Sequence, residues 1–117
     1  MPPLTLEQAF DFSVEYATAD EVARIRLSLE QRTIIVPEHA VIASDDDAIT
    51  LSQVFSVIGS GVPVSKDFPN SRSRQAGINF EGRAGGSRKI RVKISWDNGY
   101  YVVTVHAIAK IKRKKSR

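Results

Sequence analysis

The sequence predicts an α+β fold, in which N-terminal helices and a further helix are followed by a mainly antiparallel β-sheet. Three observations predict it: helix-capping motifs recur in the first half, alternating β-rich segments follow residue 62, and an Asn98-Gly99 turn joins the last two segments. The 117 residues have the length of one domain. We therefore expect a single domain over residues 1–109 and a polybasic tail over residues 110–117.

The first 31 residues are acidic and are predicted to be helical. Residues 5–8 (TLEQ) and 18–21 (TADE) each place a hydroxyl at an N-cap position and a Gln or Glu three residues later. Two helices with a break near Thr18 are expected. The alternation of apolar residues over 10–16 is also compatible with a strand, so a strand stays an alternative to the first helix.

The middle of the chain predicts an edge segment and a third helix. A β-branched run at residues 33–36 is interrupted by Pro37 and resumes over residues 39–43, as in an edge strand or an irregular segment. A third capping motif at residues 50–53 (TLSQ) begins a helix that the glycines near residue 60 end. The acidic run at residues 45–47 lacks the spacing of a calcium loop, so we expect no metal site.

The second half predicts four β segments, at residues 62–64, 77–80, 89–96 and 100–108. Asn98-Gly99 favours a two-residue type I′ hairpin, which fixes the pairing of the last two strands. In that register Trp96 lies opposite Tyr101 on the buried face. The other face carries Arg91 beside His106 and places Lys89 and Lys93 on the same side.

Charge is distributed very unevenly along the chain. Residues 1–47 hold three basic and ten acidic side chains, whereas residues 83–117 hold eleven basic side chains and one acidic one, within a net charge of +4. A cationic region attracts polyanions through counterion release, so nucleic acid is the first partner to consider. The absence of cysteine, of a secretion signal and of a long apolar stretch leads us to expect a cytoplasmic protein without membrane contact.

The predicted polar sheet face combines cations with a histidine, which could be a solvated surface or a site. A neutral imidazole among cations can accept a proton, and arginine forks bind phosphate. The candidate catalytic residues are His106, Arg91, His39, Lys93 and Arg83. The candidate nucleic-acid-binding residues are Lys66, Arg72, Arg74, Lys89, Tyr100, Lys112, Arg113 and Lys114. No cofactor is expected.

Short motifs in a fixed order carry a resemblance to a known group. Residues 38–40 (EHA), 49–50 (IT), 59–61 (GSG), 80–83 (FEGR) and 101–105 (YVVTV) resemble small bacterial toxin-like domains related to RelE and BrnT. The resemblance implies a RelE-like sheet, metal-independent ribonuclease activity and an antitoxin partner. His39 matches the histidine that precedes the capped helix, and Arg91 and His106 correspond by position. The acidic N-terminal helices and the polybasic tail depart from the pattern.

Three functional hypotheses therefore remain. The first is a ribonuclease in which the 2′-hydroxyl attacks the adjacent phosphate, with His106 or His39 as general base and cations stabilising the transition state. The second is a module that binds RNA or DNA without chemistry, which predicts a steep salt dependence. The third is a protein interaction domain in which the acidic helices pair with the basic third of a partner.

Overall fold

The computed structural model describes residues 4–69, 75–83 and 88–108. Four helices come first, α1 (Leu6–Ala9), α2 (Ala19–Glu30), α3 (Glu38–Asp46) and α4 (Leu51–Ser60), and four strands follow, β1 (Val62–Asp67), β2 (Gly77–Arg83), β3 (Lys89–Trp96) and β4 (Tyr100–Ala107). The strands form an antiparallel meander in the order β1-β2-β3-β4. The predicted α+β class, with helices before the sheet, is confirmed. Within the described ranges, no helix has the length and apolar character needed to cross a membrane.

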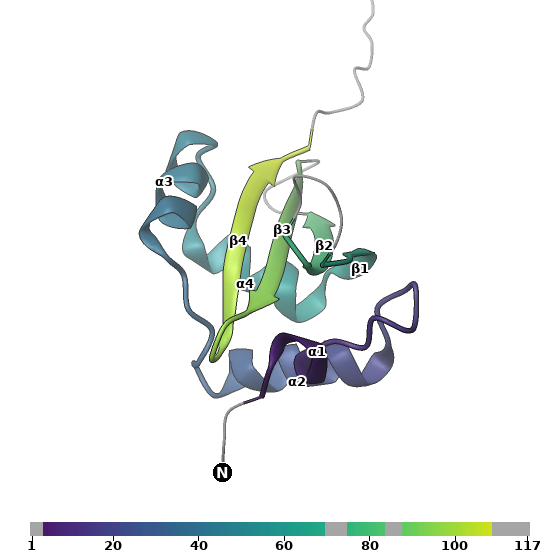
Figure 1. Cartoon of the computed structure of the whole chain (residues 1–117). Coiled ribbons are helices and arrows are strands. Elements are labelled where there is room, and N and C mark those ends of the chain that lie inside the picture. The colour runs from purple at the N-terminus through teal and green to yellow at the C-terminus, as the bar shows by residue number, and fades with distance from the viewer. Residues whose placement is uncertain (1–3, 70–74, 84–87, 109–117) are drawn as a thin grey trace, which may run out of the picture.

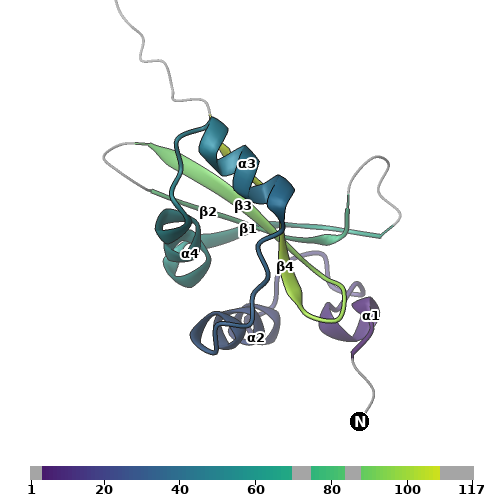
Figure 2. The same ribbon diagram turned by 90° about the vertical axis from the view of Figure 1, so that its left-hand side faces the viewer.

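The helices are divided between one face of the sheet and one of its edges. α2 and α4 cover one face, whereas α3 lies along β4 (Figures 1 and 2). The core forms where Phe80 and Val92 of the sheet meet Ile25 of α2 and Ile58 of α4, all of which are fully buried. The other face of the sheet is not covered by α2 or α4 and carries polar residues of β2, β3 and β4, whereas Lys66 of β1 pairs with Ile78 on the helix-covered side.

The three predicted capping boxes are all present. At Thr5, Thr18 and Thr50 the threonine hydroxyl accepts from the backbone amide three residues on, and that residue's side chain accepts from the threonine amide. The first helix is nevertheless shorter than predicted and ends at Ala9, and the segment after it is neither helix nor strand. The chain turns there because Phe10 is buried and its ring packs edge-on against Tyr100, with centroids 6.0 Å apart.

Residues 39–43 belong to helix α3, so their prediction as an edge strand or irregular segment is wrong. Pro37 is the N-cap of this helix, a position that tolerates a missing N–H. The helix covers the outer edge of β4: His39 Nε2 donates to the Val103 carbonyl at 3.0 Å, and Ala107 N donates to the Asp47 carboxylate at 2.8 Å. Together with a parallel bridge between Ile35 and β4, these contacts protect the edge from pairing with another chain.

The β3–β4 hairpin follows the predicted register in one half only. Arg91 pairs with His106 as predicted, but the register shifts between Lys93 and Ile94, so that Trp96 faces Tyr100 instead of Tyr101. The loop therefore contains three residues, 97–99, and not two. The shift buries Tyr100, whose ring packs edge-on against Trp96 at a centroid distance of 4.8 Å. This aromatic packing overrides the two-residue turn that Asn-Gly favours.

Candidate functional site

Three ionisable side chains form a row across the sheet face that α2 and α4 do not cover. Glu81 of β2 pairs with Arg91 of β3, and Arg91 pairs with His106 of β4. Directly paired residues on one face have Cβ atoms about 4.5–5.5 Å apart. The carboxylate, the guanidinium and the imidazole are therefore neighbours, with the guanidinium in the middle. Val62 of β1 pairs with Glu81 and extends the row to the edge of the sheet.

Arg91 and Glu81 form an ion pair that remains accessible to a ligand. The Arg91 Nε donates to Glu81 Oε2 at 2.8 Å, and Nη2 contacts the same oxygen. The Arg91 side chain is 38% exposed and that of Glu81 is 15% exposed. A guanidinium has five N–H groups, so this contact leaves donors for an anion. His106 is exposed on the other side of Arg91.

Lys93 lies on the same face of the sheet as Arg91, as predicted, but it is buried and paired with a carboxylate instead of being exposed. Its side chain is 7% exposed, and its Nζ forms an ion pair with Asp67 at 3.0 Å. Asn79 Nδ2 donates to the Asp67 carboxylate and to the Ser65 hydroxyl, both at 3.0 Å. These contacts complete a polar cluster beside the row. The burial and the paired charge of Lys93 argue against the predicted contact with a phosphate.

Two of the predicted nucleic-acid-binding residues are buried, which corrects their expected exposure. Lys66 Nζ lies inside the protein, 2.9 Å from Glu21, and donates to the backbone carbonyls of Asp11 and Val14. Tyr100 is 3% exposed, and burial raises the pKa of its hydroxyl. The acidic helical region therefore supplies the partner of Lys66, and neither residue can reach a polyanion on the surface.

The other candidates fall into three groups. His39 holds α3 against β4 through the Val103 carbonyl and does not belong to the row. Arg83 and Lys89 pair across β2 and β3 beside the row and are exposed. In the part of the chain that the structure describes, no carboxylate forms an ion pair with either of these two cations. Arg72, Arg74, Lys112, Arg113 and Lys114 lie outside the described residues.

Glu81 is the site residue that the sequence reasoning did not identify as functional. A signal was present, because Ile78 and Phe80 alternate with Asn79 and Glu81, which predicts a polar face on this strand. What the sequence lacks is the register between β2 and β3. The five residues between these strands do not indicate one loop length, so only the structure places Glu81 opposite Arg91.

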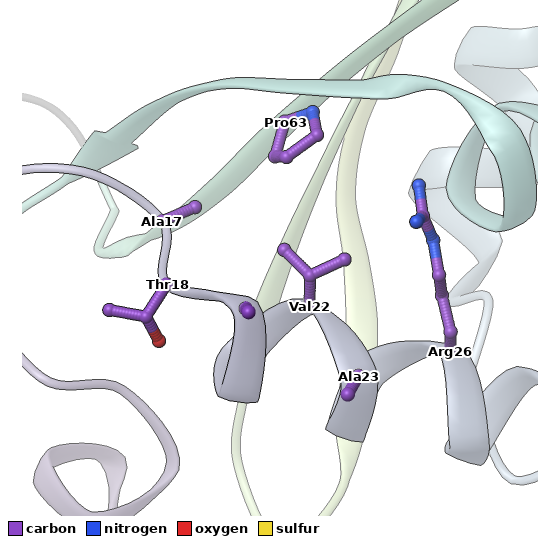
Figure 3. Close-up of a pocket in the computed structure, with 7 residues that line it drawn as sticks. Ala17, Thr18, Val22, Ala23, Arg26 and Pro63 are labelled. Atoms are coloured by element: carbon purple, nitrogen blue, oxygen red, sulfur yellow. The ribbon is translucent and has the colours of Figure 1, made fainter.

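Several hollows lie on the described surface, and one of them borders the row. The hollow in Figure 3 lies between α2 and β1, where Val22 points toward Pro63 and Arg26 stands beside them. Arg26 donates to the carbonyls of Ile58 and Gly61 at 2.9 and 2.7 Å, so its charge serves the end of α4. A second hollow is lined by Leu29, Arg32, Ile34 and Phe55. A third, of about 440 Å³, includes a residue of the row, Glu81.

Among residues 4–69, 75–83 and 88–108, no group of three or more histidine, aspartate or glutamate side chains is gathered as a metal site would require. No family model, curated protein or solved structure matches this chain. The functional interpretation consequently depends on the geometry of the row and its surroundings.

Proposed function

We propose that this protein is a metal-independent ribonuclease of the toxin type, and that Glu81, Arg91 and His106 form its active site. The observation that supports the proposal is their order across three adjacent strands, with a cation between a carboxylate and an imidazole. RNA cleavage by its own 2′-hydroxyl needs a proton acceptor on one side of the phosphate, a proton donor on the other, and positive charge between them.

Each group has a role in that reaction. The Glu81 carboxylate takes the proton of the 2′-hydroxyl while the 2′-oxygen forms a bond to phosphorus. The bond from phosphorus to the 5′-oxygen of the next nucleotide breaks, and protonated His106 gives its proton to that oxygen. The products are a 2′,3′-cyclic phosphate and a 5′-hydroxyl, and no cofactor takes part. This assignment makes Glu81 the general base and His106 the general acid.

Arg91 stabilises the charge that builds on the phosphate oxygens. Its ion pair with Glu81 fixes the guanidinium on the sheet face, and the donors that Glu81 does not use can bind phosphate. A preorganised cation lowers the barrier when it binds the transition state more tightly than the substrate. Arg91→Lys keeps the charge but loses the planar fork, so we expect it to lower kcat more than it changes KM.

The test is incubation of the full chain with single-stranded RNA in the presence of EDTA, with analysis of the ends produced. We expect 2′,3′-cyclic phosphate and 5′-hydroxyl ends from the wild type. Glu81→Gln and His106→Ala should each lower kcat/KM by about 10²–10⁴-fold, as for the loss of a general base or acid. His39→Ala is the matched control, because that histidine lies outside the row, and it should stay within a few-fold of wild type.

Other outcomes would support the competing hypotheses. Intact RNA with a salt-sensitive gel shift would indicate a binding module without chemistry. Salt-sensitive self-association without nucleic acid would indicate a charge-driven interaction domain. Cleavage that is equal in wild type, Glu81→Gln and His106→Ala would show that the row is not the active site. The toxin type further predicts that the wild type, but not His106→Ala, arrests growth when expressed and that an antitoxin protein relieves the arrest.

A further inference from the structure

The hollow beside Glu81 has the composition of a nucleotide subsite. Val62 and Val64 form its apolar wall and are 62% and 43% exposed. Arg83 and Lys89 line it on the other side, and Glu81 lies between the wall and the cations. Its volume of about 440 Å³ falls within the range of about 300–1,000 Å³ that small-molecule sites occupy.

The chemistry of the hollow suits an unpaired nucleic-acid base. Aliphatic walls can cover the face of a base, and the backbone of an edge strand offers N–H and C=O groups to its edge. β1 is at the edge of the sheet, since only β2 pairs with it among the described strands. The two exposed cations beside the hollow can contact the phosphates that flank the same nucleotide.

We propose that this hollow holds the nucleotide on the 5′ side of the cleaved phosphate, so that single-stranded RNA crosses the sheet in the 5′ to 3′ direction from β1 to β4. This inference rests on the proposed ribonuclease function. The attacking 2′-hydroxyl belongs to the 5′ nucleotide, and the base that accepts its proton, Glu81, lines the hollow. The leaving 5′-oxygen belongs to the 3′ nucleotide, and its proton donor, His106, lies two strands away.

The proposal restricts the substrate to RNA whose base is free. A base in a duplex is stacked and paired, so it cannot enter a hollow between β1 and β2, and recognition of single-stranded segments follows. The 5′ nucleotide should contribute most of the binding, because Arg83 and Lys89 lie on its side of the row. Beyond His106, helix α3 covers the edge of β4.

The first experiment measures binding without catalysis. Calorimetric titration of the full chain in EDTA should show that a nucleoside 3′-monophosphate binds at least about tenfold more tightly than the matching 5′-monophosphate, because only the former places its base in the hollow and its phosphate on Arg91. Val62→Glu should abolish this preference. Leu27→Glu is the matched control, because it introduces the same charge at a similarly exposed residue of α2, which covers the opposite face of the sheet. Equal affinities in the wild type would overturn the proposal.

The second experiment uses oligodeoxynucleotides that contain one ribonucleotide, with the base removed on either side of the cleavable phosphate. Removing the base uncovers the apolar wall of the hollow, which should lower affinity by at least about tenfold. We expect a loss of that size in kcat/KM when the 5′ base is absent and a smaller loss for the 3′ base. Cleavage with the opposite or no asymmetry would refute the subsite and leave the ribonuclease intact. Failure of the wild type to cut any RNA would refute both.

Discussion

The ion pair between Lys66 and Glu21 offers the sharpest test of how the acidic and basic parts of the chain are joined. The side chains of Lys66 and Glu21 are 0% and 2% exposed, and Lys66 Nζ lies 2.9 Å from Glu21 Oε2. We predict that Lys66→Met strongly destabilises the protein, because it leaves the Glu21 carboxylate charged and buried without its cation. It also removes the donor to the carbonyls of Asp11 and Val14.

The expected magnitude follows from the burial. Removing one member of a buried ion pair costs about 3–5 kcal/mol. An unfolding entropy of about 2.1 cal/mol/K per residue gives about 0.25 kcal/mol/K for a chain of 117 residues. The midpoint of thermal unfolding should therefore fall by about 12–20 °C. Adding Glu21→Gln to Lys66→Met should restore part of this loss, because no charge then remains buried.

Thermal unfolding can be followed by the fluorescence of Trp96, the single tryptophan, which packs on Tyr100. Lys89→Met is the matched control, since it removes an exposed lysine, and it should change stability by no more than about 0.5 kcal/mol. The reasoning would be refuted if Lys66→Met lowered the midpoint no more than Lys89→Met, or if the losses from Lys66→Met and Glu21→Gln simply added.

Three further predictions concern the same scaffold. Burial alone would raise the pKa of Glu21, but hydrogen bonds from Thr18, Lys66 and Asp11 outweigh it and leave that pKa below its ordinary value. Ionised Glu21 therefore stabilises the fold at pH values above the ordinary pKa of a glutamate, and this stabilisation is lost as the pH falls through the lowered pKa. Acid titration should consequently destabilise the wild type more than Glu21→Gln. Gly77 has φ +157° and an added Cβ would overlap the Ile94 carbonyl, so Gly77→Ala should cost about 2–5 kcal/mol in urea unfolding. At Gly99 (φ +150°) only the strained backbone opposes an alanine, and about 1–2 kcal/mol is expected.

Local signals in the sequence were sufficient to predict the fold class and much of the helix layout. The capping boxes at Thr5, Thr18 and Thr50 depend on residues three apart, so a short window contains all the necessary information. Helix length was less predictable. The first helix ends early because Phe10 packs against Tyr100, and a contact between residues 90 positions apart leaves no trace in local periodicity.

Electrostatic partners were the least predictable feature. The uneven charge along the chain predicted a cationic sheet face, yet Asp67 and Glu81 neutralise Lys93 and Arg91 on that face. The partner of Arg91 comes from the adjacent strand β2 and that of Lys93 from β1, two strands away, and the sequence did not determine the register of these strands. The pairing of Arg91 with His106 was predicted because the Asn98-Gly99 turn indicates a register, whereas the five residues between β2 and β3 do not indicate one loop length.

The pair of Glu81 and Arg91 could stabilise the sheet without taking part in catalysis, and exchanging the two residues separates these roles. Glu81→Arg combined with Arg91→Glu can re-form an ion pair across β2 and β3, and a partly exposed pair of this kind contributes about 0–1 kcal/mol. Stability should therefore remain within about 1 kcal/mol of wild type in urea unfolding. The kcat/KM for RNA cleavage by the swapped variant should be at least about 10²-fold lower than that of the wild type, because the carboxylate no longer lines the hollow and the cation no longer lies between acid and base. A stable swapped variant that cleaves RNA like the wild type would show that the pair is structural only.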